Sequence, residues 1–203
     1  MSCCDNNCAA DALRENQRGT LQAVLAINAV MFVVIVVAAQ YAKSTALFAD
    51  SLDNLGDAMT YALSLMVVAS GVAAKARVAF FKGMLILLAA LVVAGQIAYK
   101  LVHPEIPIFG LMGIFSLVAL AANSACLALL WRHRNEDINM SSVWECSRND
   151  IATNLSVFVA AGAVWLFGAG WPDMVVATAL VIMLLRSSAR VISNSIKELR
   201  VAA

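Results

Sequence analysis

Three acidic residues lie within two helical turns of the apolar stretch 45–72, at Asp50, Asp53 and Asp57, with Asn54 among them. A carboxylate at bilayer depth is costly, so an acid inside such a stretch marks a functional site. A helix advances about 100° per residue, so Asp53 and Asp57 lie on one face, with Asp50 close beside them. Like charges on one stripe repel each other unless a positive charge lies between them. The pattern therefore predicts a cation site, which a metal ion would satisfy.

A second pair of candidate ligands lies nearer the C-terminus. Asp150 is the only other acid clearly embedded in an apolar stretch, Cys146 precedes it by four residues, and Thr153 continues the same helical face. Two such pairs on facing helices could supply three oxygens and one sulfur in a tetrahedral arrangement. The predicted metal ligands are Asp53, Asp57, Cys146 and Asp150.

Helices that cross a membrane are needed to position these residues. The chain has 203 residues, of which 62% are hydrophobic and only 13% charged, and its mean hydropathy is +0.83. Soluble domains carry about 25% charged residues, and a helix needs about 20 apolar residues to cross the hydrocarbon. Six segments are long enough: 20–41, 45–72, 79–101, 107–131, 143–168 and 173–193. We expect an all-α membrane protein with six transmembrane helices and no soluble C-terminal domain.

The positions of the basic residues predict the topology. All Lys and Arg residues except Lys43 and Lys100 lie at the N-terminus, the 2–3 and 4–5 connections and the C-terminus. The positive-inside rule then places both termini in the cytoplasm. We expect a cysteine-containing cytoplasmic tail over 1–18, a membrane domain over 19–195 and a short cytoplasmic tail over 196–203. The net charge of +1 gives no indication of nucleic-acid binding.

Several polar residues have weaker assignments. We expect Asp50 to support the ligands through hydrogen bonds rather than to touch metal, and Asn54 and Asn154 are further candidates for this role. Asp53 and Asp57 could instead form a structural polar seam with asparagines on other helices, or a sodium or proton site. Cys146 could equally be a buried small hydrophobe, and Cys126 is expected to pack in this way.

The N-terminal segment carries its own cysteines, Cys3, Cys4 and Cys8. This spacing resembles a tail that captures soft metals, because thiolates suit zinc, cadmium or lead. A flexible tail with three cysteines can equally be inert. The odd total of five cysteines and a cytoplasmic N-terminus argue against disulfides.

The stretch 44–57 resembles the helix 2 signature of the cation diffusion facilitators, with Asp50 at the fixed aspartate before the ligand pair Asp53 and Asp57. Cys146 and Asp150 match the helix 5 pair of that family, with Asn154 one turn later. Other positions that look like those of the family are Asn28, Phe32, Asn123 and Trp171-Pro172-Asp173. The resemblance implies six membrane helices, a transport site between helices 2 and 5, and a homodimer. The chain departs from the family in having Cys146 where histidine is usual, no acid near Ile35 on helix 1, and no C-terminal domain after Arg200.

These features lead us to expect a secondary transporter that exports a divalent cation from the cytoplasm by proton antiport. The cation would be zinc or a soft relative such as cadmium, carried as substrate, and no resident cofactor is expected. We expect no enzymatic activity, since the sequence shows neither a nucleotide-binding loop nor a nucleophile with its base. Expected partners are the lipid bilayer, the cation and protons, in a multi-pass protein of the bacterial inner membrane. The alternatives are a proton-coupled carrier of organic cations and a non-transporting membrane module that binds metal.

Overall fold

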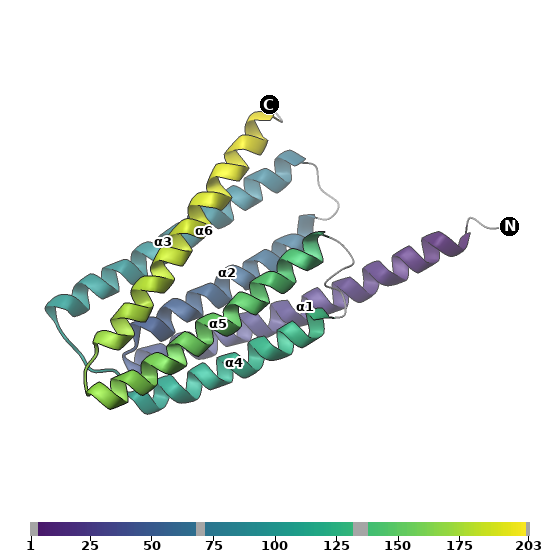
Figure 1. Ribbon diagram of the computed structural model, residues 1–203. Helices are drawn as coiled ribbons and strands as arrows, with labels where there is room; N and C mark the ends of the chain where they lie inside the picture. Colours follow the sequence, from purple (N-terminus) through teal and green to yellow (C-terminus); the bar gives the residue numbers. More distant parts are fainter. Residues whose placement is uncertain (1–3, 68–71, 132–137, 202–203) are drawn as a thin grey trace.

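The computed structural model describes the backbone of residues 4–67, 72–131 and 138–201. It also describes the side chains in these ranges, except those at 4–17, 63–64, 66–67, 72–75, 78, 82, 138–149 and 201. The described chain is entirely helical apart from short connections (Figure 1). The helices are α1 (Cys4–Ala42), α2 (Thr45–Val67), α3 (Val72–Val102), α4 (Phe109–Trp131), α5 (Ile138–Phe167) and α6 (Trp171–Val201). The prediction of six helices is confirmed.

Helix α1 begins earlier than the sequence analysis indicated. The segment 1–18 was expected to be a cysteine-containing cytoplasmic tail, and its location in the cytoplasm stays a prediction. Helix α1 starts within it at Cys4 and continues without a break to Ala42. At about 1.5 Å per residue, this helix of 39 residues is much longer than the hydrocarbon core is thick. Its first turns therefore extend beyond the bundle, as Figure 1 shows.

Five of the six helices are long and apolar enough to cross a membrane, and they contain the spans Arg18–Ala42, Ala79–Val102, Phe109–Trp131, Asp150–Phe167 and Trp171–Arg200. Helix α2 does not meet the same criterion, because every 18-residue stretch of it contains Asp50, Asp53 and Asp57. Its neighbours compensate, since α2 packs against α1, α3, α5 and α6. Among the described residues, α2 is also the one helix without an exposed large hydrophobic side chain. It is the interior helix of the bundle.

The helices form two groups that share one end. Helices α3 and α6 pack against each other, and α1 packs on α2 and α4 while α4 packs on α5. The α3–α6 pair diverges from the other four helices toward the end where α1 begins and α6 ends (Figure 1). Within the pair, Ser188 Oγ donates to the carbonyl of Gly83 at 2.9 Å. A Cβ on Gly83 would lie 2.7 Å from Ile192 Cγ1, so glycine permits this close approach.

The connections at the opposite end are short, and residues that end, cap or reverse a helix lie in each of them. Pro104 and Pro107 lie between α3 and α4, where proline cannot continue a helix. Ser44 caps α2, because its Oγ accepts a hydrogen bond from the Leu47 N–H at 3.1 Å. Lys43 reverses the chain before α2 with a left-handed φ of 54°. Gly168 reverses the chain after α5 with a φ of 59°.

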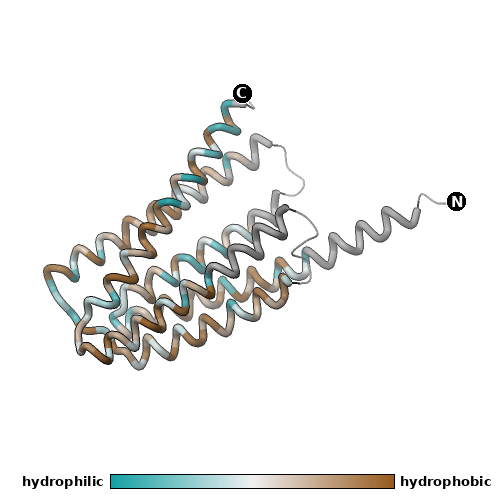
Figure 2. The backbone as a smooth tube through the Cα atoms, viewed as in Figure 1, coloured by the Kyte–Doolittle hydropathy of each residue, from teal (hydrophilic) through white to brown (hydrophobic). Residues whose placement is uncertain are grey.

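The outer surface of the bundle is apolar. Exposed Val, Leu, Ile and Phe side chains cover α1, α3, α4, α5 and α6, and Figure 2 shows hydrophobic residues along these helices with hydrophilic positions on α2. An apolar exterior of this extent is unusual for a protein surrounded by water and suits one surrounded by lipid.

Candidate functional site

The acids of α2 lie at different depths in the bundle. Asp50 is only 2% exposed, and its Oδ2 atom has no hydrogen-bond partner in the described part of the chain. Asp53 and Asp57 are half-buried, and the carboxylate of Asp53 lies close enough to Asp50 to act on it electrostatically. Asn54 donates from Nδ2 to the backbone carbonyl of Asp50 at 3.0 Å, a bond within its own helix. The acids of α2 thus extend from the buried core at Asp50 to a partly accessible face at Asp53 and Asp57.

Polar residues from four helices form a layer between two apolar clusters. We use the term polar layer for Asn28 on α1, Asn54 and Asp57 on α2, Asn123 on α4 and Asn154 on α5. On α1, α2 and α4 the polar layer separates two clusters of buried hydrophobic side chains. The larger cluster includes Ile35, Leu47 and Met112. The smaller cluster includes Val24, Tyr61 and Leu130. The four asparagines are each less than 5% exposed. Half-buried Asp57 therefore lies in a layer that also contains four buried amides.

Cys126 connects α1, α2 and α4 within this region. Asn28 Nδ2 donates to the carbonyl of Val24 at 3.0 Å and lies 3.8 Å from Cys126 Sγ, a hydrogen-bonding distance for sulfur. Cys126 is fully buried, and the charge of Asp57 lies close enough to act on its thiol. The sequence analysis expected Cys126 only to pack, and it missed this contact because the two partners are 98 residues apart.

Helix α5 contributes polar groups that face the interior. Helices α2 and α5 are packed against each other, Asp150 is half-buried and Thr153 is 4% exposed. Asn154 is completely buried, and neither of its amide atoms has a hydrogen-bond partner among the described residues. Unpartnered buried amides are rare, and each one calls for a functional or structural explanation.

The four predicted ligands are only partly described. Asp53, Asp57 and Asp150 belong to neighbouring helices, and each of them takes part in an interaction with its surroundings. The side chain of Cys146, like those of Cys4 and Cys8 and the whole of Cys3, lies outside the described residues. Within the described residues, no three Asp, Glu, His or Cys side chains lie close enough together to hold a metal. The four-ligand centre stays a prediction.

A second polar network joins the helices at the end opposite the chain termini. The buried carboxylate of Asp173 accepts hydrogen bonds from Ser44 Oγ at 2.6 Å and from the N–H groups of Thr45 and Ala46 at 2.8 and 3.0 Å. Lys100 Nζ lies 3.8 Å from the same carboxylate and also donates to the carbonyl of Lys43. One carboxylate on α6 thereby caps the first turn of α2 and pairs with the last turn of α3, and so it fixes where α2 begins.

An apolar bundle whose interior helix carries three acids defines a class of protein, the multi-pass membrane proteins that handle a charged solute. The comparison with protein families then identifies the family. The model of the cation efflux transmembrane domain matches residues 21–200, and the chain belongs to this family, whose members are cation transporters and not enzymes. No curated protein matches the chain. The predicted membership of the cation diffusion facilitators is confirmed.

Proposed function

We propose that this cation transporter exports zinc, or a related soft divalent cation such as cadmium, from the cytoplasm in exchange for protons. The observation that carries the proposal is the interior position of α2, a helix that carries three acids and packs against α5 in a protein of the cation efflux family. Acids that face the interior of a membrane bundle mark ion pathways and proton relays. The depth shared with buried asparagines supports a site near the middle of the membrane.

The proposed ligands are Asp53 and Asp57 from α2 with Cys146 and Asp150 from α5. Three oxygens and one sulfur suit a tetrahedral ion of borderline softness, and the thiolate disfavours harder ions such as magnesium. Asn154 supports the same site, since its unpartnered amide can orient a ligand carboxylate or a water on the cation.

Proton exchange follows from the chemistry of these ligands. Carboxylates and thiols bind metal only when deprotonated, so binding releases protons and reprotonation favours release of the metal. An inward proton gradient would then drive the cation outward. Alternating access would come from movement of the α3–α6 pair against the other four helices, the two groups that diverge in Figure 1.

The test is metal flux in inside-out vesicles that contain the purified full chain, with zinc, cadmium, manganese and cobalt as substrates. Asp57→Asn keeps the size of the side chain and removes a ligand, so flux should fall to the level of empty vesicles. The matched control is Glu105→Gln, an exposed acid at the far end of the bundle, which should transport like the wild type. Lowering the pH on the metal-loading side should weaken uptake, because protons compete for the ligands.

Two outcomes would overturn the proposal. Wild-type flux in Asp57→Asn would remove the acids of α2 from the pathway. Metal binding by the purified protein without any flux in sealed vesicles would indicate a binding module instead of a transporter. Proton release on metal binding, measured by calorimetry in two buffers with different ionisation enthalpies, separates the metal site from a site for organic cations.

A further inference from the structure

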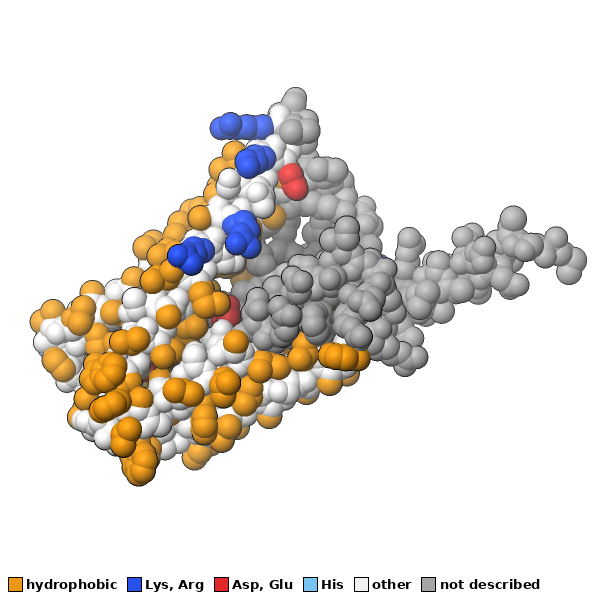
Figure 3. Space-filling view, viewed as in Figure 1, with side chains coloured by type: hydrophobic (Ala, Val, Ile, Leu, Met, Phe, Trp, Pro, Cys, Tyr) orange, Lys and Arg blue, Asp and Glu red, His pale blue; other side chains and the backbone are white. Residues whose placement is uncertain are grey.

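The last half of α6 carries four basic residues on one face. Arg186, Arg190, Lys197 and Arg200 are all exposed, and their spacing of four, seven and three residues places them within about 80° of each other around the helix. We refer to these four residues as the basic stripe. Figure 3 shows them as a blue row along the upper part of α6. Within the described part of the chain, none of the four forms an ion pair with an acid.

The basic stripe faces away from the partner helix. The opposite side of α6 packs on α3, where Ser188 bonds to Gly83 and Ile192 lies against it. Ser188 and Ser195 on that side are 1% and 2% exposed. The stripe therefore lies on the surface that the bundle presents to its surroundings.

The same face of α6 is apolar nearer the start of the helix. Val175, Ile182 and Met183 are between 44% and 58% exposed, and their spacing aligns them with Arg186. A row of side chains that suits lipid tails thus continues into a row that suits anionic headgroups. This face of α6 changes from apolar to basic between Met183 and Arg186.

The length of α6 places the second half of the basic stripe beyond the membrane boundary. Its 31 residues extend about 46 Å at 1.5 Å per residue, against about 30 Å of hydrocarbon. If Asp173 marks one boundary, as its polar network indicates, about 20 residues reach the other boundary near residue 193. Arg190 then lies about one turn and Arg186 about two turns inside this boundary, and long basic side chains extend from such positions toward the headgroups. Lys197 and Arg200 lie beyond the boundary.

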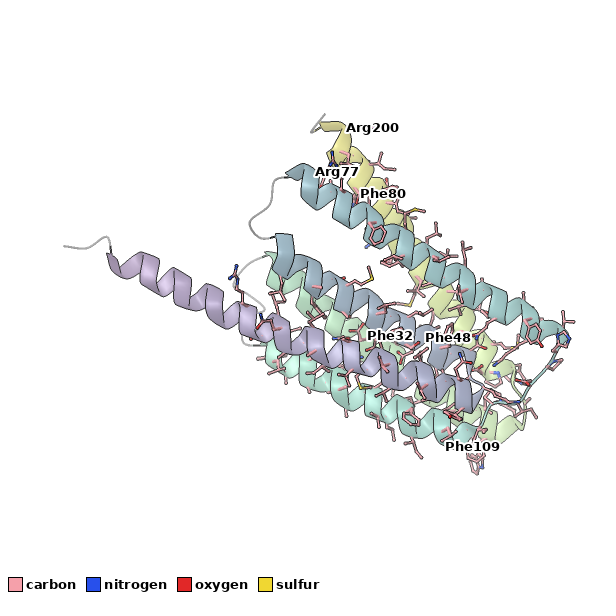
Figure 4. All side chains as sticks on the ribbon, turned by 180° about the vertical axis from the view of Figure 1, so that it is seen from behind. Phe32, Phe48, Arg77, Phe80, Phe109 and Arg200 are labelled. Carbon is pink, nitrogen blue, oxygen red and sulfur yellow. The ribbon has the colours of Figure 1, made fainter. Side chains whose placement is uncertain are left out.

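We propose that the basic stripe of α6 binds the headgroups of anionic phospholipids, whose tails lie along Val175, Ile182 and Met183. Clusters of four or more basic residues next to a membrane helix favour anionic lipids, and arginine matches phosphate through paired hydrogen bonds. An acidic protein could reach Lys197 and Arg200 but not Arg186 and Arg190 beside the lipid-facing side chains. Figure 4 shows that exposed Arg77 of α3 lies at the same end of the molecule as Arg200.

The proposal is tested by the affinity of the purified full chain, in neutral detergent micelles, for phosphatidylglycerol that carries a fluorophore on its acyl chain. Binding is followed by fluorescence anisotropy, with labelled phosphatidylcholine as the neutral lipid. Each basic residue near an anionic headgroup contributes about fivefold in affinity. The double variants Arg186→Gln with Arg190→Gln, and Lys197→Gln with Arg200→Gln, should each bind phosphatidylglycerol about 25-fold more weakly than the wild type. The binding should also weaken as salt is added.

The matched control replaces two exposed basic residues outside α6, with Arg18→Gln and Lys43→Gln together. This control should keep the wild-type affinity, and circular dichroism should show equal helicity in all variants. An equal loss in the control would show a general effect of net charge and overturn the proposal. Wild-type binding in both α6 variants, or equal affinity for phosphatidylcholine, would overturn it as well. None of these readouts depends on transport, so they test the lipid site separately from the proposed export activity.

Discussion

Replacing Asp173 by asparagine should destabilise the whole bundle, because one carboxylate holds three helices together. The side chain is 1% exposed, accepts three hydrogen bonds from the first turn of α2 and lies 3.8 Å from Lys100 Nζ. In Asp173→Asn one acceptor becomes an amide donor that faces other donors, and the charge of Lys100 loses its partner. Hydrogen bonds to a charged group contribute about 1.5–3 kcal/mol each, and removing one member of a buried ion pair costs about 3–5 kcal/mol. These effects overlap, so we expect the free energy of unfolding to fall by about 3–5 kcal/mol.

The measurement is reversible unfolding in mixed micelles of increasing SDS content, followed by circular dichroism. Glu105→Gln is the matched control, because it makes the same acid-to-amide change at the same end of the molecule. Glu105 pairs with Lys43 at 3.0 Å, but the two side chains are 44% and 55% exposed, and exposed pairs contribute at most about 1 kcal/mol. If Asp173→Asn lost no more stability than Glu105→Gln, the role assigned to the cap between α6 and α2 would be wrong.

Three further predictions concern Gly83, Asn154 and Cys146. Gly83→Ala should lower the free energy of unfolding by about 1–3 kcal/mol, because the new Cβ would meet Ile192. The control Gly95→Ala, whose Cβ meets nothing within 4 Å, should raise the free energy of unfolding by up to about 1 kcal/mol. Equal free energies of unfolding for the two variants in SDS titrations would contradict the close approach of α3 and α6. Asn154→Leu should leave stability unchanged or raised, because it removes a buried amide without a partner, and yet it should reduce metal flux severalfold. A stable variant with full flux would separate Asn154 from the site. Cys146→Ala should lower cadmium flux more than manganese flux in the same vesicles, and an unchanged ratio would argue against a thiolate ligand.

Much of the fold could be predicted from local features of the sequence. The ends of α2, α4 and α5 lie within five residues of the expected boundaries, because apolar length, proline and helix capping act over a few neighbouring residues. Helix α3 ends one residue from its expected boundary but starts seven residues before it. The start of α1 could not be predicted in this way. The segment 4–18 lacks an apolar pattern, and its helix continues from the span that follows it.

The candidate site could be predicted only in part. The acids of α2 were recognisable because carboxylates are rare in a segment that is otherwise long and apolar, and the sequence of that segment shows this directly. The same acids make α2 less apolar than the other five helices, each of which is apolar enough to cross a membrane, although α2 is the interior helix. The contacts of Cys126 and Asp173 depend on residues 98 and up to 129 positions away in the chain, and no local pattern contains that information.

The sequence by itself determined that this is a helical membrane protein of six segments with a row of acids in the second, since helix length and the cost of buried charge are properties of each segment alone. Only the tertiary structure decided that α2 lies at the centre, that α3 pairs with α6, and that Asp173 caps a helix to which it is not joined. The physical reason is that these features arise from how helix surfaces fit against one another. That fit depends on side chains from several helices at once.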